Sequence, residues 1–169
     1  DPGDLSAQTT FTVTITPVND APSMDPGPDI QLEEDQGDQL FKAWATDIVP
    51  GPPNEATQDV AIAISNDNTT LFANQPVLKD NGDLEFTPQS NETGIATVTV
   101  VLTDDGGTAN GGVDTRAYAF TITIKGDNDP PTSTGIEDLE IAEDAAPITY
   151  NLFDIFADVE DADDALVFS

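Results

Sequence analysis

Hydrophobic residues alternate with polar or small residues along most of the chain, with a period of two. This period is typical of β-strands that bury one face. The stretches that follow it are 30–32, 60–64, 84–86, 96–102 and 118–124. Residues 40–45 also have the composition of a strand, although Lys42 and Trp44 would then share one face. No segment has a helical period, so we expect a structure made of strands.

Turn-forming sequences separate these stretches, at Asp80–Asp83, Asn91–Gly94 and Asn110–Gly112. Many short strands within roughly 100 residues are typical of a β-sandwich with Greek-key connections. The pattern therefore predicts an all-β fold, a Greek-key β-sandwich of immunoglobulin-like type.

The sequence contains an internal repeat. Residues 11–20 (FTVTITPVND) and 120–129 (FTITIKGDND) are identical at six of ten positions, with an offset of 109 residues. The offset continues beyond this segment, since Pro22 corresponds to Pro131. A period of this length is too long for a solenoid unit and fits a complete small domain.

The repeat divides the chain into three parts. We expect residues 1–20 to hold the last strand of a preceding repeat and its linker. Residues 21–129 then form one complete repeat, and residues 130–169 form the first strands of a following, truncated repeat. The chain is interpreted as part of a longer tandem array.

Composition narrows the possible functions. The chain has four Lys and Arg against 33 Asp and Glu, a net charge of −29, and neither His nor Cys. Nucleic acids and anionic membranes are therefore excluded as partners, because both bind clustered cations. No apolar run approaches the roughly 20 residues that span a bilayer. Carboxylate oxygen, the ligand that calcium prefers, remains abundant.

Catalysis is not expected. Without His and Cys, neither a Ser–His nor a Cys–His pair can be formed. Asp104 and Asp105 are adjacent on one strand end and point apart, whereas glycosidase carboxylates face each other. Trp44 could belong to a sugar-binding platform, but Phe86 and Phe120 occupy inward strand positions, which favours core packing for the aromatic residues.

The acidic residues gather at the ends of the predicted unit, because successive antiparallel strands place alternate loops at opposite ends. The candidate ligands at the N-terminal end are Asn19, Asp20, Asp47, Glu55, Asp104 and Asp105. The candidate ligands at the C-terminal end are Glu34, Asp127, Asn128 and Asp129, facing Asp158, Glu160 and Asp161 of the following unit.

Such clusters repel unless a cation is present. Two carboxylates about 5 Å apart repel by roughly 3 kcal/mol at an effective dielectric constant near 20. Calcium takes about six to eight oxygen ligands in a flexible geometry and offsets this repulsion. We therefore expect Ca²⁺ at both junctions. The alternative is that the acidic loops only keep a repetitive β-protein soluble.

The same residues resemble a known family. An early Glu34, Asp-rich loops and an Asn-Asp-x-Pro linker resemble the cadherin repeat. The stretches 44–55, 103–115 and 120–129 are similar to cadherin-like, immunoglobulin-like tandem repeats of large bacterial surface proteins, including RTX-type adhesins. Two features depart from these patterns: the second Asn of cadherin linkers is absent, and so is the glycine-rich RTX nonapeptide.

The resemblance implies a calcium-binding structural repeat of an extracellular adhesin, secreted to the cell surface by a Gram-negative bacterium. It would act as a calcium-stiffened spacer or adhesion module, with neighbouring repeats of the same chain as partners. The alternative function is a carbohydrate-binding or homophilic module on the cell surface. Such a module needs an exposed aromatic patch or a flat, unpaired strand edge.

Overall fold

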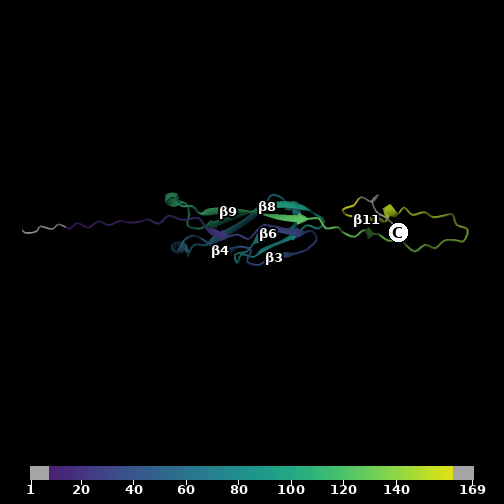
Figure 1. The fold of residues 1–169 in the computed structure, drawn as a ribbon, viewed down its shortest axis with the longest axis horizontal. Coiled ribbons are helices and arrows are strands. Elements are labelled where there is room, and N and C mark those ends of the chain that lie inside the picture. Colours follow the sequence, from purple (N-terminus) through teal and green to yellow (C-terminus); the bar gives the residue numbers. More distant parts are fainter. Residues whose placement is uncertain (1–7, 162–169) are drawn as a thin grey trace, which may run out of the picture.

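The structure is a computed structural model, and it describes residues 8–161. Nine strands between Ser23 and Lys125 form an elongated β-sandwich (Figure 1). They are β1 (Ser23–Asp25), β2 (Ile30–Glu33), β3 (Gln39–Phe41), β4 (Thr46–Val49), β5 (Val60–Asn66), β6 (Phe72–Leu78), β7 (Leu84–Pro88), β8 (Gly94–Asp104) and β9 (Thr115–Lys125). The helical elements of residues 8–161 are short 3₁₀ turns, η1 (Pro53–Glu55), η2 (Thr69–Leu71), η3 (Ala109–Gly111) and η4 (Leu152–Asp154), and none could cross a membrane.

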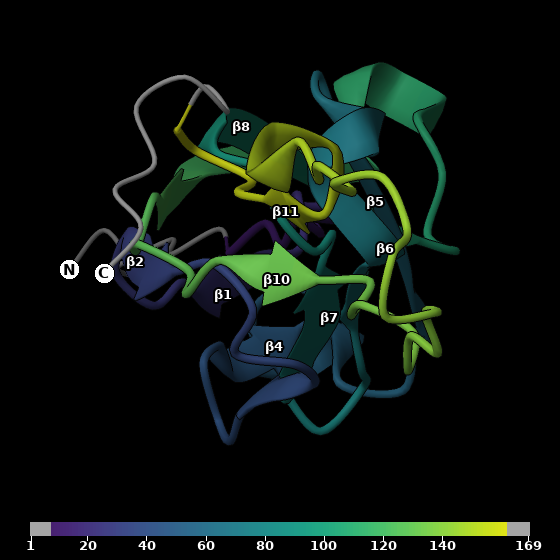
Figure 2. The same cartoon turned by 90° about the vertical axis from the view of Figure 1, so that its right-hand side faces the viewer.

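Two layers of strands make up the sandwich. One layer is a four-stranded sheet in the order β2-β9-β8-β5. The other holds a three-stranded sheet, β3-β7-β6, and the short pair β1-β4 (Figure 2). All these pairings are antiparallel except that between β2 and β9, which is parallel. The predicted all-β sandwich is therefore present.

The core lies between the two layers and follows the period-two pattern. The inward residues Val98, Val100 and Leu102 of β8 are fully buried. Trp44 and Phe120 pack together with ring centroids 4.2 Å apart. Each large apolar side chain that is buried in this way contributes about 1.5–3 kcal/mol. Trp44, Phe86 and Phe120 thus pack in the core, as expected, and Trp44 is not part of a surface sugar-binding platform.

In the segment 39–49, a break in the strand explains why the sequence shows no single alternation of inward and outward residues. The strand breaks between β3 and β4 at Ala43, whose φ is +49°. Asp83 accepts a hydrogen bond from the backbone N–H of Ala43 at 2.7 Å and stabilises this left-handed residue. Because of the break, Lys42 stays exposed while Trp44 turns into the core.

Strand β6 was not predicted. Its sequence, Phe-Ala-Asn-Gln-Pro-Val-Leu, does not alternate and contains Pro76. The pairing with β7 shifts register twice, and β6 lies at the edge of its sheet. An edge position with irregular pairing is where a strand tolerates proline, because the missing N–H faces outward.

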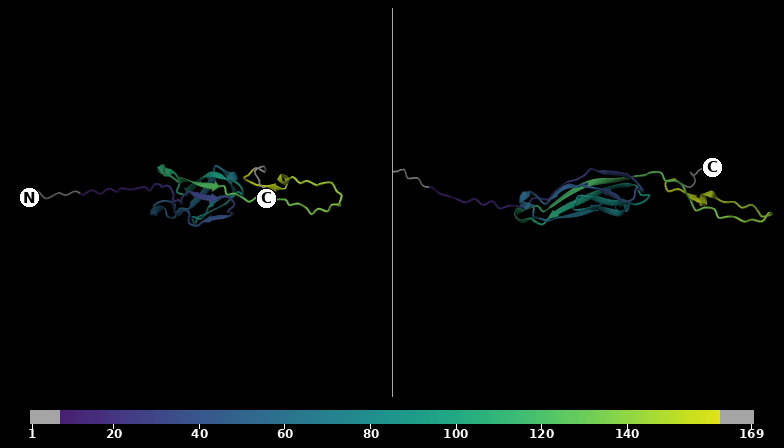
Figure 3. Two further views of the ribbon diagram at one scale, coloured as in Figure 1. Left: turned by 45° about the vertical axis from the view of Figure 1, so that its right-hand side comes forward. Right: turned by 90° about the horizontal axis from the view of Figure 1, so that it is seen from below.

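The flanks extend from opposite ends of the sandwich (Figures 1 and 3). Residues 8–20 have no regular structure, and Phe11 and Ile15 each expose 86% of their surface. Beyond the other end, β10 (Thr132–Ser133) pairs with β11 (Phe156–Ala157). Thr132 lies 109 residues after Ser23 of β1, and the β10-β11 pair is antiparallel like the β1-β4 pair. The division into repeats nevertheless stays a prediction.

Candidate cation sites at the two junctions

Asn19 fastens the N-terminal linker to the sandwich; we call this end the first junction. Its side-chain nitrogen donates to Asp104 Oδ1 and to the backbone oxygen of Val113, both at 2.8 Å. Its side-chain oxygen accepts from Gln58 Nε2 at 2.8 Å. Its backbone oxygen accepts from the N–H of Val113 at 3.0 Å. Linker and sandwich are therefore joined at this residue without any metal.

Glu55 holds the next linker residue. The backbone N–H of Asp20 donates to both carboxylate oxygens of Glu55, at 3.3 and 3.2 Å. The η1 turn, which begins after Pro52, positions Glu55 here. Two glycines leave the necessary space: a Cβ at Gly51 would strike the Glu55 carboxylate, and one at Gly106 would strike the side chain of Asn19.

Two carboxylates of the first junction are buried without a cationic partner. Glu55 and Asp104 each expose only 6% of their surface. Asp104 Oδ1 accepts from Asn19 and from the N–H of Gly106, but Asp104 Oδ2 is buried with no partner. Within residues 8–161, the one ion pair joins Lys79, just after β6, and Glu85 on β7. An ionised carboxylate buried without a partner costs several kcal/mol.

Glu34 is a buried carboxylate at the C-terminal end, which we call the second junction. It too exposes only 6% of its surface. Its Oε1 accepts from the backbone N–H of Asp127 at 3.1 Å, and its own N–H donates to Lys125 O at 2.9 Å. The second linker is thus fastened to the sandwich that precedes it.

The second linker is also fastened to the segment that follows it. The backbone N–H of Asp129 donates to Glu160 Oε2 at 3.2 Å. Asp158 Oδ1 accepts from the N–H groups of Glu160 and Asp161, both at 3.0 Å. Loss of hydration, together with the negative charges of Asp129 and Asp158, raises the pKa of Glu160 despite its hydrogen bonds.

The same type of contact occurs at both junctions. Asp20 and Asp129 are 109 residues apart, and each donates its backbone N–H to a Glu that follows a short antiparallel strand pair: Glu55 after β1-β4, and Glu160 after β10-β11. Glu160 therefore makes the same type of contact as Glu55, although the two residues are 105 positions apart rather than 109.

Three contributors were not among the predicted site residues. With its amide nitrogen facing both carboxylates, Asn91 donates to Asp35 Oδ2 and Asp129 Oδ2, each at 3.2 Å. Both Asn91 and Asp35 have positive φ values, +57° and +59°. Gln58 bonds Asn19 at the first junction. A neutral amide carries no charge signal in a sequence, so Gln58 and Asn91 could not be found from charge patterns.

Several predicted residues do not join the others. Asp47 lies in β4 rather than in a loop, is exposed, and has no side-chain hydrogen bond to a described residue. Asp105 instead accepts from the N–H of Asp59 at 3.1 Å. The side chain of Asn128 bonds only within its own linker, to Asp129 O at 2.8 Å. Across residues 8–161, no three acidic side chains converge closely enough to hold a metal ion by themselves.

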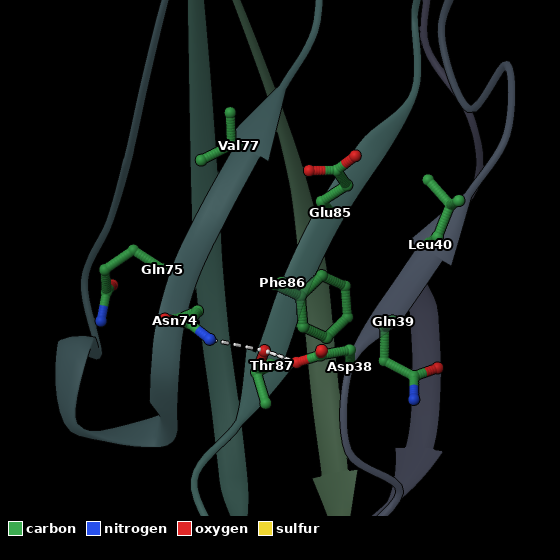
Figure 4. A pocket seen from close by; sticks show the side chains of 9 residues that line it. All are labelled: Asp38, Gln39, Leu40, Asn74, Gln75, Val77, Glu85, Phe86 and Thr87. Carbon is green, nitrogen blue, oxygen red and sulfur yellow. Dashed lines mark hydrogen bonds between the residues drawn. The ribbon is translucent and has the colours of Figure 1, made fainter.

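A separate depression lies on the outer face of the three-stranded sheet (Figure 4). Its volume is about 330 Å³. Asn74 donates to Thr87 at 3.0 Å, and the Thr87 hydroxyl donates to Asp38 at 2.6 Å. Leu40 and Val77 expose 51% and 43% of their surface there. No aromatic ring is exposed in this depression, since Phe86 is 2% exposed.

Comparisons with known proteins give little further direction. No protein-family model and no curated protein matches the chain. Among solved structures, the chain is similar to the solution structure of the PKD domain from KIAA 1837 protein, with 12% sequence identity. That similarity covers 73% of this chain and 100% of the other, with a TM-score of 0.34. The fold described above rests on the strand pairing rather than on this similarity.

Proposed function

We propose that this chain is a calcium-binding structural repeat of an extracellular bacterial adhesin, and that it acts as a calcium-stiffened spacer or adhesion module. It has no catalytic role in this proposal. Its partners are the neighbouring repeats of the same chain, and its place is the surface of a Gram-negative bacterium. The cadherin-like, immunoglobulin-like character of the repeat belongs to the same proposal and rests on the sequence resemblance.

The observation that carries the proposal is the unpartnered Oδ2 of Asp104. This oxygen is buried at the first junction next to the linker, and no Lys or Arg side chain pairs with Asp104. Glu34 and Glu55 are buried beside the linkers in the same way. A divalent cation at each junction would offset the charge of the carboxylates there, and oxygen donors of this kind fit calcium.

The donor set also fits calcium in its composition. Since three carboxylates do not converge, backbone and amide oxygens would have to complete the coordination shell. Calcium accepts such mixed shells of about six to eight oxygens, whereas magnesium demands an octahedron of shorter bonds. Extracellular modules bind calcium with Kd values of about 10⁻⁴–10⁻³ M, and we expect this range.

Calcium titration by calorimetry, combined with small-angle X-ray scattering, tests the proposal. We expect binding heat and a more extended, stiffer particle in CaCl₂ than in chelator. The variant Asp129→Ala should weaken binding at the second junction. Asp80→Ala, in the β6-β7 hairpin turn, is the matched control and should leave binding unchanged. The proposal would be contradicted if calcium titration gave no binding heat and the scattering profiles in CaCl₂ and in chelator were identical.

The alternative, a carbohydrate-binding or homophilic module, would use the depression on the β3-β7-β6 face. Its hydrogen-bonded chain of Asn74, Thr87 and Asp38 offers polar groups for sugar hydroxyls. The lack of an exposed ring disfavours sugar stacking at this place. A glycan array and sedimentation in CaCl₂ distinguish the two functions, because the spacer alone binds no glycan and forms no dimer.

A further inference from the structure

Gln58 lies beside the linker at the first junction. Its backbone N–H donates to Glu55 O at 2.9 Å, which places it one 3₁₀ turn after Glu55. A Cβ at Gly106 would strike the side chains of both Asn19 and Gln58, so the glycine leaves room for their contact. Gln58 is uncharged, and its contacts with Asn19 and Glu55 place it within the first junction.

The orientation of the Gln58 amide is fixed by its neighbour. The nitrogen of Asn19 has two acceptors, Asp104 Oδ1 and Val113 O, so the oxygen of Asn19 must face Gln58. Only the nitrogen of Gln58 can donate to that oxygen, which it does at 2.8 Å. Gln58 Oε1 is consequently turned away from Asn19, where it is buried without any donor.

A second buried oxygen without a partner belongs to Asp104, which accepts from the side-chain nitrogen of Asn19. Asp104 Oδ2 is also buried and unpartnered, on a residue that exposes 6% of its surface. Both orphan oxygens therefore belong to side chains that bond the same Asn19. Two buried acceptors without a donor are costly, by about 1–3 kcal/mol for each group, unless something positive binds them.

We propose that Gln58 is a neutral oxygen ligand of the cation site at the first junction, alongside Asp104 and Glu55. This inference rests on the proposed calcium function and adds a residue to it. Calcium accepts the carbonyl oxygens of Asn and Gln side chains. A neutral ligand also explains how a site can form where no three carboxylates converge, because it adds an oxygen without adding repulsion.

Calcium titration of Gln58→Leu in the full chain tests this role, with amide NMR shifts to separate the junctions. The amides of Gly106 and Val113 report on the first junction, and those of Asp127 and Asp129 on the second. We expect about a tenfold weaker response at the first junction, the effect of losing roughly 1.4 kcal/mol. The second junction should respond as in the wild type. Gln31→Leu, an exposed matched control on β2, should change neither.

A second variant covers the case in which Gln58→Leu fails to fold. Gln58→Glu restores an oxygen at this position, and we expect it to bind calcium at the first junction at least as tightly as the wild type. Melting in chelator shows whether each variant is folded. A wild-type response of Gly106 and Val113 in folded Gln58→Leu overturns the inference and leaves the proposed function standing. Absence of any calcium response in the wild type overturns the proposed function itself.

Discussion

The two junctions carry the same Asn-Asp pair but are fastened differently. At the first, Asn19 reaches into the following sandwich and makes four hydrogen bonds with it. At the second, Asn128 bonds only within its own linker, and the connection to the preceding sandwich comes from Glu34 through a backbone N–H. The comparison shows that the same Asn-Asp pair can be held by side-chain amide contacts or by a carboxylate that accepts from the linker backbone.

Charge also differs between the junctions. The residue before the Asn-Asp pair is Val18 in the first linker and Asp127 in the second. The first junction buries two carboxylates, those of Glu55 and Asp104, whereas the second buries only that of Glu34 and leaves Asp129 and Glu160 more open to solvent. Burial makes an uncompensated charge more costly, so the first junction has more to gain from one cation.

The largest expected effect is that of Asp104→Asn. Saturating calcium, at 100 times its Kd, stabilises a folded protein by about 2.7 kcal/mol, and this gain should be largely lost at the first junction. In chelator the variant should be as stable as the wild type or more so, because an unpaired buried charge is removed while an oxygen remains for Asn19. Thermal melting in both conditions measures this. Lower stability in chelator with full calcium stabilisation would contradict it.

A smaller effect is expected from breaking the fastening itself. Asn19→Ala removes three side-chain hydrogen bonds, at a cost of about 1–3 kcal/mol. The backbone N–H of Val113, which donates to Asn19, should then exchange its hydrogen faster in chelator. Asn128→Ala is the matched change at the second junction and should cost less than about 0.5 kcal/mol. Equal effects of the two substitutions would remove the difference between the junctions.

The smallest effect concerns pH at the second junction. Because the pKa of Glu160 is raised, its carboxyl holds a proton at a pH where an ordinary Glu is ionised. Calcium competes with this proton, so calcium affinity should fall as the pH decreases through the raised pKa. Carbon-detected NMR titration of Glu160 should show a lower pKa in CaCl₂ than in chelator. The same pKa in both conditions would place calcium elsewhere.

The sequence predicted the regular part of the fold and less of its irregular part. Strands β5, β7, β8 and β9 follow the period-two pattern because they bury one face against the opposite sheet. The break at Ala43 depends on a hydrogen bond that its N–H donates to Asp83, which is 40 residues away along the chain. Strand β6 depends on an edge position, which only the assembled sheet defines.

The residues of the candidate sites also divide into those that the sequence pattern predicted and those that it did not. Alternation of loops placed Asn19, Glu55 and Asp104 at one end of the unit. There, hydrogen bonds join Asn19 to Asp104 and Glu55 to the backbone of Asp20. Asp47 had the same charge signal but lies within a strand. The contributions of Gln58 and Asn91 arise from amide groups that complete hydrogen-bond networks, and such networks leave no trace in a charge pattern.

The parallel pairing of β2 with β9 gives the unit a defined response to mechanical load. Strand β9 runs into the C-terminal linker, and β2 follows the N-terminal linker after the short strand β1. The two strands are paired at four successive positions from Ile30–Ile122 to Glu33–Lys125. A pull on the two linkers draws the strands past each other along their length. The hydrogen bonds between them then carry the force together rather than opening one after another, so tension along an array of such units would be resisted by shear.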